Sequence, residues 1–442
     1  MSPVQQQNMT ARRLAYQILL RCELDQVYSN IVLDTAIRRH RLSDADRALL
    51  TTLVYGTLEK KLTLDYLISH LADRATDEMD AEALVLIRMG LYQLRYLDRI
   101  PDHAAVSETV ELASRRYRGF VNAILRAYTR EGKDIPMPDM TASPIDYLSV
   151  RYSYPRPLCE RFVATFGVQK TERIFAAWDT PPELTLRVNT LKTSVAVLSD
   201  RLRAAGYTVF PARHAPDALC VSGGNVTAMP GFDEGEFFVQ DEASQLCVEA
   251  VGVKPSMTVF DICACPGSKS FGMAIHMKNT GTLRAFDLHE NKLSLIDKGA
   301  ERLGITNVKT AARDGREFDV ALEGSADAVL CDVPCSGFGV IAKKPEIRYK
   351  DLSECDRLPD IQLAILENAC RYVRSSGTLV YSTCTLLAEE NGGNVARFLQ
   401  KRPEFKPCDF TVGDLTSTDG MLTLTPDEHG TDGFFMAKFT KE

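Results

Sequence analysis

The chain has 442 residues, a formal net charge of −7 and 45% hydrophobic residues, which is the composition of a globular protein with several domains. No apolar run approaches the ~20 residues that a membrane-spanning helix needs, and the amino terminus lacks the hydrophobic core of a signal peptide. Twelve cysteines without regular spacing do not form a disulfide framework, and no Cys-x-x-Cys pair or suitably spaced histidine predicts a metal site. We therefore expect a cytoplasmic protein without metal, and the net charge alone indicates no nucleic-acid partner.

Residues 10–130 are expected to form an all-α bundle, because apolar side chains such as Leu14 and Ile18 recur at helical spacing. Ser43 and Asp46 resemble a capping box at the start of one helix. The end of the bundle carries a basic group, here called the arginine cluster, which comprises Arg115, Arg116, Arg118, Arg126 and Arg130. Such a cluster is either a solvated helix face or a phosphate-binding face, and composition alone favours the solvated face.

This first segment resembles the NusB-type RNA-binding helical domain. The resemblance covers most of residues 8–131 and is carried by Asp46-Arg47, Leu53-Val54-Tyr55-Gly56, Ile100-Pro101-x-His103-Ala104-Ala105-Val106 and Phe120-Val121-Asn122-Ala123-Ile124-Leu125-Arg126. Domains of that family bind RNA or partner proteins and do no chemistry themselves. The resemblance thus implies a NusB-like domain over residues 1–131 and an RNA-binding role for the arginine cluster.

A linker and a small α+β module are expected next. Residues 132–144 are polar and proline-rich without periodicity, which is typical of a linker. Residues 145–235 are interpreted as the module, which contains a strand at Thr185–Asn189, a helix at Leu198–Ala205 and a strand at Tyr207–Phe210. Arg187 and Asn189 share one face of their strand, where they either contact RNA or belong to an ordinary surface strand.

Residues 236–442 alternate between strands and helices, which predicts a parallel sheet. The expected strands are Thr258–Ile262, Thr282–Phe286, Val308–Ala311, Ala328–Cys331 and Thr378–Ser382. Residues able to do chemistry follow nearly every one of these strands. Ligands of open α/β sheets bind at that edge, so we expect a site there.

The loop Asp261–Lys269 leads from the first of these strands into a helix, and its small residues let backbone amides approach a ligand. It is neither Gly-x-Gly-x-x-Gly nor a P-loop, which favours a ligand without phosphates. Asp287, Asp314 and Asp332 lie at the ends of the next strands. Each alone is more often a cap or turn former, but together they suit a cofactor with ribose hydroxyls, an exocyclic amine and a positive charge, as S-adenosylmethionine has.

Two cysteines are placed in neighbouring loops of the same edge. Cys335 lies in the stretch Asp332–Gly339, and Cys384 lies in Tyr381–Thr385, which is followed by Glu389-Glu390-Asn391. Free cysteines are usually small buried hydrophobic residues. Two of them beside a cofactor cleft, each flanked by polar residues, indicate a chemical role instead.

Residues 145–442 resemble the Fmu/RsmB-type RNA cytosine-5 methyltransferases. The resemblance is carried by Val239–Ser244, the loop Asp261–Lys269, Asp332–Gly339, Pro345–Tyr349, Tyr381–Cys384 and Thr431–Phe435. Together with the NusB-like segment it covers nearly the whole chain. It implies an α/β protein with a Rossmann-like S-adenosylmethionine-dependent methyltransferase sheet, preceded by a small α+β module and an all-α NusB-like bundle.

The resemblance also implies a reaction and its site. The expected reaction is methylation of carbon 5 of a cytosine in 16S rRNA, through a covalent cysteine adduct at carbon 6. Cys384 would be the nucleophile, Cys335 would assist breakdown of the adduct, and Asp332 would hold the base. S-adenosylmethionine would be bound by Cys263, Ala264, Cys265, Pro266, Gly267, Ser268, Lys269, Asp287, Asp314 and Asp332. We expect a monomer that binds free 16S rRNA or an assembling small subunit, with no membrane and no metal.

Some positions depart from the family pattern. Cys265 and Ser268 stand where alanine and glycine are usual, and Lys292 stands where arginine is common. Because the other loop residues and the aspartates remain, we expect the cofactor to bind. Two alternatives stay open: a catalytically silent RNA-binding protein, and a methyltransferase with Cys335 as the nucleophile, as in the DNA cytosine-5 enzymes. An oxidoreductase is disfavoured because the glycine fingerprint is missing.

Overall fold

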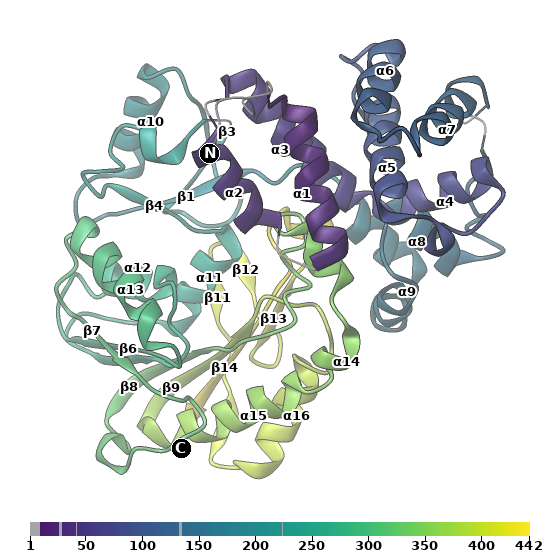
Figure 1. The fold of residues 1–442 in the computed structure, drawn as a ribbon. Coiled ribbons are helices and arrows are strands. Elements are labelled where there is room, and N and C mark those ends of the chain that lie inside the picture. Colours follow the sequence, from purple (N-terminus) through teal and green to yellow (C-terminus); the bar gives the residue numbers. More distant parts are fainter. Residues whose placement is uncertain (1–8, 26–28, 41, 132–134, 223) are drawn as a thin grey trace. The chain divides into compact units, whose positions relative to one another are not determined.

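The computed structural model describes residues 9–25, 29–40, 42–131, 135–222 and 224–442. The chain divides into two compact units (Figure 1). The helical unit comprises Met1–Glu172 and the segment Lys344–Lys350, and the sheet unit comprises Arg173–Lys343 and Asp351–Glu442. The first eight residues, and positions 132–134 of the expected linker, lie outside the described residues.

The helical unit is built around a buried central helix, α5 (Ala81–Tyr96), because apolar residues occur on every side of it. The helices around it are α1 (Ala11–Asp25), α2 (Ser29–Arg39), α3 (Asp44–Glu59), α4 (Lys61–Ala72), α6 (Asp102–Leu112) and α7 (Arg118–Glu131). They are followed by α8 (Pro144–Tyr152) and by α9 (Arg156–Trp178), whose first part lies in this unit and which is interrupted at Gly167. The expected all-α bundle is confirmed.

Helix α7 shows why this part of the chain is helical. Val121, Ile124, Leu125 and Tyr128 recur at helical spacing and are buried. All members of the arginine cluster are exposed. The charged residues therefore occupy the solvent side of the helix and the preceding turn, where a phosphate group can reach them.

The sheet unit begins with a small antiparallel sheet of order β2-β3-β1-β4. Its strands are β1 (Leu184–Val188), β2 (Thr208–Pro211), β3 (Ala218–Ser222) and β4 (Phe237–Val239). Helix α10 (Val195–Ala204) buries Leu198 and Leu202 against Leu186 and Val188 of β1. This is the expected α+β module.

A larger, eight-stranded sheet follows, in which the order is β10-β14-β9-β8-β5-β6-β7 and β13 pairs with β14. Its strands are β5 (Thr258–Asp261), β6 (Thr282–Asp287), β7 (Val308–Ala312), β8 (Ala326–Asp332), β9 (Val373–Thr383), β10 (Phe405–Pro407), β13 (Met421–Leu424) and β14 (Phe434–Lys441). Strands β5 to β9 pair in parallel, and β14 runs antiparallel between β9 and β10. Every strand expected in this region is confirmed.

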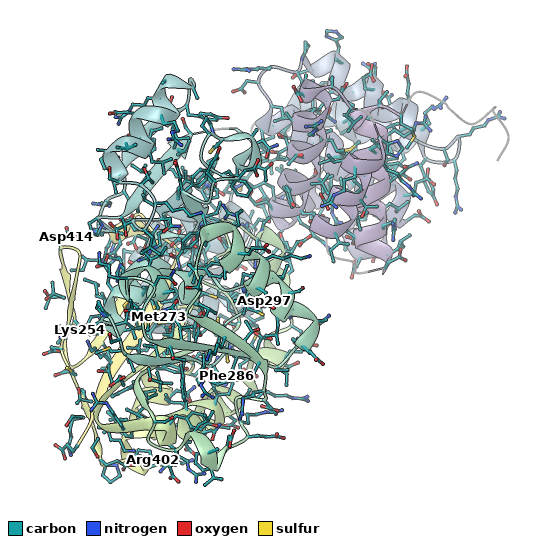
Figure 2. All side chains as sticks on the ribbon, turned by 90° about the vertical axis from the view of Figure 1, so that its left-hand side faces the viewer. Lys254, Met273, Phe286, Asp297, Arg402 and Asp414 are labelled. Atoms are coloured by element: carbon teal, nitrogen blue, oxygen red, sulfur yellow. The ribbon has the colours of Figure 1, made fainter. Side chains whose placement is uncertain are left out.

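Helices cover both faces of the large sheet (Figure 1). On one face are α11 (Glu242–Val251), α12 (Ser268–His276) and α13 (Glu290–Leu303), and on the other are α15 (Leu358–Ala369) and α16 (Gly392–Lys401). Successive residues of β5 alternate between the two cores, with Val259 in one and Phe260 in the other. Figure 2 labels Met273 and Phe286, which belong to these two buried cores. The expected Rossmann-like arrangement is confirmed, whereas the expected domain boundaries remain predictions.

Candidate active site

The order of the strands places the expected residues at one edge of the large sheet. It reverses between β5 and β8, and open α/β sheets bind ligands at such a switch point, beside the carboxyl ends of the strands. Asp287 and Asp332 are the last residues of β6 and β8, and Cys384 directly follows β9. Asp314 lies just beyond the end of β7. The structure thus gathers the expected carboxylates and cysteines at this edge.

The loop between β5 and α12 is held by backbone hydrogen bonds. The Ala264 N–H donates to the carbonyl oxygen of Phe286 over 2.8 Å. The Cys265 N–H donates to Oδ2 of Asp287 over 3.1 Å. This hydrogen bond uses the backbone, so the replacement of the usual alanine by Cys265 does not remove it. The loop is therefore fixed to the end of β6, where a ribose-binding carboxylate is expected.

Glycine is required at Gly267 but not at the next position. Gly267 has a φ of +108°, and a Cβ added to it would lie 2.7 Å from the ring of Phe271. Ser268 is the first residue of α12 and has no positive φ, so its backbone suits any L-residue. The serine that departs from the family pattern thus causes no backbone strain in the loop.

Four carboxylates surround the Cys263 thiol. Its pKa is raised well above the ordinary value, first by burial and then by the negative charges of Asp261, Asp332, Asp287 and Asp314. A high pKa keeps this thiol protonated, which disfavours a nucleophilic role for Cys263. The thiol therefore lies in an acidic environment at this edge of the sheet.

Lys269 and Asp332 form an ion pair at the end of β8. Lys269 Nζ lies 2.7 Å from Oδ2 of Asp332, and the Ser382 hydroxyl donates to Oδ1 of Asp332 over 2.8 Å. Lys269 Nζ also lies 5.1 Å from the centre of the Phe434 ring. Both oxygens of Asp332 are therefore fixed in direction, as a group that orients a substrate requires.

The two cysteines bring their sulfur atoms to 3.1 Å from each other. The hydrogen bond from Cys335 lowers the pKa of Cys384, and the charge of Lys269 also lowers it, against the opposing effects of burial and Asp332. The pKa of Cys335 is raised well above its ordinary value, because the same hydrogen bond and burial favour its protonated form. The pair thus favours a thiolate on Cys384 and a thiol on Cys335.

Close backbone contacts tie the loops of the site together at Gly339. Its N–H donates to the carbonyl oxygen of Cys384 over 2.9 Å, and its carbonyl oxygen accepts the Gly433 N–H over 2.8 Å. A Cβ at Gly339 would lie 1.8 Å from the Gly433 oxygen. Only glycine permits this approach, which holds the Cys335 loop beside Cys384.

A buried polar network around Gln362 and Glu390 supports both cysteine loops. Gln362 Nε2 donates to the Pro334 carbonyl over 3.0 Å and to Oε2 of Glu390 over 2.6 Å. The same carboxylate oxygen accepts the Ser336 N–H over 3.0 Å. The Tyr381 hydroxyl donates to the Glu390 carbonyl over 2.5 Å. Glu390 and Gln362 together thus fix the backbone on either side of Cys335.

Lys343 supports the site from another side. Its Nζ lies 2.7 Å from Oδ2 of Asp432 and also contacts Asp241. Burial raises the pKa of Asp432 to about 7, and the Asp241 charge adds to this rise, whereas Lys343 opposes it. These three residues line a cavity of about 610 Å³. No motif in the sequence distinguishes Lys343 from Lys344, or the buried Glu390 from the exposed Glu389, so neither supporting residue is predictable from the sequence.

The expectation that Arg187 and Asn189 lie on a surface is wrong. Arg187 is 1% exposed, donates to Gln240 over 3.2 Å and lies 2.8 Å from Nε2 of His276. Asn189 is 0% exposed, and its amide donates to the carbonyls of Gly235 and Leu303 over 2.9 Å each. Both residues are structural, because the face of β1 that they share packs inside the unit.

Asp261 predicts a measurable pH dependence of stability. Burial raises its pKa from 3.8 to about 7, and its hydrogen bond from Ser270 only partly opposes this. Between these pH values the folded protein binds a proton that the unfolded chain has lost, so stability falls as the pH rises. Because Asn does not titrate, Asp261→Asn should gain up to about 4 kcal/mol relative to the wild type between pH 4 and pH 7.

The measurement is urea unfolding of both proteins at several pH values, followed by the fluorescence of Trp178. This is the single tryptophan of the chain, it is 3% exposed and it belongs to the sheet unit. Parallel stability curves for the two proteins would show that Asp261 is ionised throughout.

Within residues 9–442, apart from the gaps named above, no group of three His, Cys, Asp or Glu side chains is arranged to hold a metal ion. No helix in that part of the chain is long and apolar enough to cross a membrane.

Comparisons with known proteins agree along the whole chain. The family model described as 16S rRNA methyltransferase RsmB/F matches residues 249–440, that of the NusB family matches residues 9–130, and that of the RsmF/B-like ferredoxin-like domain matches residues 154–227. The chain is 38% identical to the probable ribosomal RNA small subunit methyltransferase B of Bacillus subtilis, over 98% of this chain and 99% of that protein. It is 36% identical to the protein of the same name from Synechocystis, over 98% and 100% of the two chains.

The fold has a solved counterpart. The crystal structure of the protein PH0851 matches with a TM-score of 0.80 and 27% identity, and the match covers 98% of this chain and 99% of the other. These matches identify the protein as a methyltransferase of ribosomal RNA, with S-adenosylmethionine as its cofactor. The chain belongs to the 16S rRNA methyltransferase RsmB/F family.

Proposed function

We propose that the protein methylates carbon 5 of a cytosine in 16S rRNA, through a covalent bond between Cys384 and carbon 6 of the base. The observation that carries this proposal is the pair of thiols 3.1 Å apart, whose pKa values are shifted in opposite directions. Methylation of a ring nitrogen, an exocyclic amine or a ribose hydroxyl needs no sulfur nucleophile. Methylation of carbon 5 needs one, because this carbon is a poor nucleophile until carbon 6 carries an added group.

The residues of the site act in sequence. The Cys384 thiolate adds to carbon 6, which makes carbon 5 resemble an enamine carbon. Asp332, held by Lys269 and Ser382, orients the base at its ring-nitrogen edge. After methylation, Cys335 gives its proton to the departing Cys384 sulfur and takes up the proton from carbon 5, so the carbon 5–carbon 6 double bond is restored and both cysteines leave the step as thiols.

The residues of the loop fit S-adenosylmethionine. Gly267 adopts the positive φ with which the loop turns into α12, and Oδ1 of Asp261 is buried without a hydrogen-bond partner among the described residues. Residues 263–269 would hold the body of the cofactor, Asp287 its ribose hydroxyls and Asp314 its adenine amine. When bound, the cofactor supplies an electrophilic methyl group at its sulfonium centre.

The arginine cluster provides an RNA-binding face in this proposal. Its five side chains are exposed on α7 and the turn before it, and exposed guanidinium groups bind phosphates without reading sequence. The target cytosine must leave any helical stack before Cys384 can reach carbon 6. The helical unit would therefore supply affinity for RNA, and the sheet unit would supply the pocket for one base.

The test is bisulfite sequencing of 16S rRNA from a strain that lacks the gene. We expect one protected cytosine to become convertible in that strain and to be protected again when the wild-type gene is restored. Calorimetry of the purified protein with S-adenosylmethionine distinguishes the methyltransferase from the main alternative. A catalytically silent RNA-binding protein would bind RNA but not the cofactor. An unchanged bisulfite pattern would contradict the proposal.

A further inference from the structure

The two cysteines of the candidate active site also have the geometry of a latent disulfide. Strands β8 and β9 pair in parallel with Asp332 opposite Ser382, so their loops leave the sheet side by side and place the sulfur atoms of Cys335 and Cys384 3.1 Å apart. A disulfide bond is about 2.05 Å long, so the sulfur atoms need to approach by about 1 Å. The Gly339 N–H holds the two loops together through the Cys384 carbonyl oxygen, so this approach requires little movement of the backbone.

The more readily oxidised sulfur of the pair is that of Cys384. Both residues are half-buried, so their sulfur atoms are open to a molecule as small as hydrogen peroxide. The hydrogen bond from Cys335 lowers the pKa of Cys384, and the charge of Lys269 also lowers it, against burial and Asp332. Peroxides oxidise thiolates in preference to thiols. The susceptible sulfur is therefore the one that the proposed reaction uses as its nucleophile.

Cys335 lies where a resolving thiol is needed. The hydrogen bond to Cys384, burial and the charge of the Cys384 thiolate raise the pKa of Cys335 well above its ordinary value. A sulfenic acid on Cys384 is neutral, so its formation removes this charge and makes Cys335 more reactive. Cysteines that respond to oxidants are often paired with a resolving cysteine in this way.

We propose that Cys335 and Cys384 form a site of reversible oxidation, at which a peroxide converts the pair into an intramolecular disulfide and stops methylation. In the first step the Cys384 thiolate attacks one oxygen of hydrogen peroxide, the O–O bond breaks, and a sulfenic acid and hydroxide are formed. In the second step the Cys335 sulfur bonds to the Cys384 sulfur, and the hydroxyl group leaves with the Cys335 proton as water. The two sulfur atoms together lose two electrons, which reduce the peroxide, and the hydroxide takes a proton from the solvent.

A thiol reductant reverses this change. It attacks the disulfide, forms a mixed disulfide and returns both cysteines to thiols. The loss of methylation rests on the proposed function, in which Cys384 is the nucleophile, whereas formation of the disulfide does not. The two parts of the inference can therefore be tested separately.

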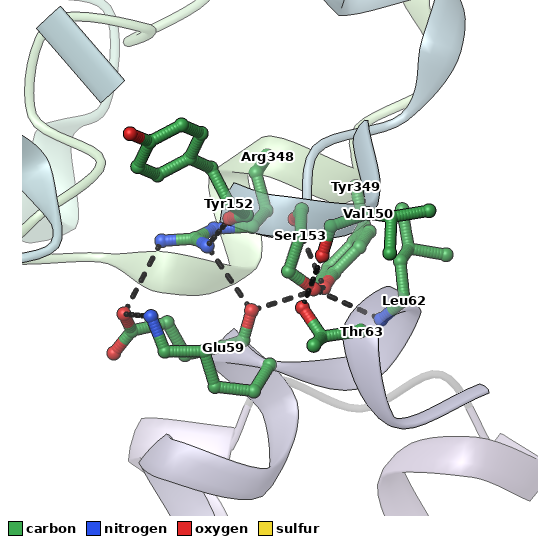
Figure 3. A network of polar contacts seen from close by, with 9 residues as sticks. Glu59, Leu62, Thr63, Val150, Tyr152, Ser153, Arg348 and Tyr349 are labelled. Atoms are coloured by element: carbon green, nitrogen blue, oxygen red, sulfur yellow. Dashed lines mark hydrogen bonds and ion pairs between the residues drawn. The ribbon is translucent and has the colours of Figure 1, made fainter. Parts of the chain in front are cut away.

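Two parts of the chain serve as controls. Cys408 directly follows β10 and is also half-buried, and its sulfur donates to the Asp409 carbonyl oxygen over 3.6 Å. In the helical unit, Arg348 Nη1 donates to the carbonyl oxygens of Glu59 over 3.0 Å and Tyr152 over 3.2 Å, at the ends of α3 and α8 (Figure 3). The residues labelled in this network contain no sulfur, so peroxide should leave it intact.

The experiment treats the purified full-length protein with increasing concentrations of hydrogen peroxide, removes the peroxide with catalase and divides each sample. One half is assayed for methyl transfer to 16S rRNA from the deletion strain, before and after dithiothreitol. The other half is alkylated and digested without reductant for mass spectrometry. We expect two peptides joined through Cys335 and Cys384, with a mass two hydrogen atoms below the sum of the free peptides. Methyl transfer should fall in proportion to this product, and dithiothreitol should restore the untreated rate.

Two variants sharpen the test. In Cys335→Ser the resolving sulfur is missing, so Cys384 should pass from sulfenic to sulfinic acid, which dithiothreitol does not reduce. This variant is followed by mass spectrometry, because Cys335 belongs to the proposed catalytic pair. Cys408→Ser should form the disulfide and lose methylation as the wild type does. Circular dichroism should stay unchanged in all samples, because the helical unit is not modified.

Oxidation of Cys408 without any peptide joined through Cys335 and Cys384 would overturn the inference and leave the proposed function untouched. Sulfinic acid on Cys384 of the wild type, formed without the joined peptides, would overturn it as well, because Cys335 would not resolve the sulfenic acid. If the disulfide formed but methylation continued, the stop of methylation would be wrong, and the assignment of Cys384 as the nucleophile would fail with it.

Discussion

Cys384→Ser is expected to lose methylation by about a thousandfold or more and to form no covalent adduct. Its thiolate is the group that activates carbon 5, and a serine hydroxyl in the same place is a far weaker acid and nucleophile. The hydrogen bond from Cys335 and the charge of Lys269 lower the pKa of Cys384. The same two interactions would not ionise a serine hydroxyl group. Transfer of a labelled methyl group to 16S rRNA measures the loss.

A folding control is available for this variant. Cys384 does not belong to the loop between β5 and α12. The affinity of Cys384→Ser for S-adenosylmethionine, measured by calorimetry, should therefore match that of the wild type. Retention of more than a few per cent of the activity would exclude Cys384 as the nucleophile. Loss of both activity and cofactor binding would instead indicate damage to the fold.

Cys335→Ser is expected to trap the reaction after attack. Cys384 keeps its thiol and can still add to carbon 6, but breakdown of the adduct loses the sulfur that lies 3.1 Å away. Loss of such a proton-transfer partner lowers turnover by about a hundredfold or more. A denaturing gel should therefore show protein bound to RNA, in an amount close to one adduct for each active protein.

The pair of variants also distinguishes the two possible nucleophiles. If adduct accumulated with Cys384→Ser and was missing with Cys335→Ser, the roles would be exchanged. The doubly substituted protein should form no adduct under either assignment. It serves as the baseline for both measurements.

The sequence predicts the large sheet well because buried parallel strands have an unmistakable pattern. Ala328–Cys331 is a continuous apolar run that ends in Asp332, and the structure extends this strand to Ala326–Asp332. The residues next to Asp332 in the sequence are sufficient to show that it ends a strand. Parallel pairing then brings Asp287, Asp332 and Cys384 to one edge without further information.

Contacts between distant parts of the chain are not predictable in this way. The burial of Arg187 depends on which face of β1 is covered, and alternation along the strand only shows which residues share a face. Arg348 and Lys343 are ordinary basic residues in the sequence, and their partners lie far away along the chain. Their roles emerge only when helix ends and aspartates from other elements are in place.

The position of β14 within the sheet has a consequence for biosynthesis. Phe434–Lys441 lies between β9 and β10, and Gly433 immediately before it donates its N–H to Gly339 in the Cys335 loop. The sheet and its thiol pair therefore cannot be completed while residues near Lys441 are still inside the ribosome that makes them. A nascent chain of this protein should therefore be unable to modify RNA until translation has passed that strand.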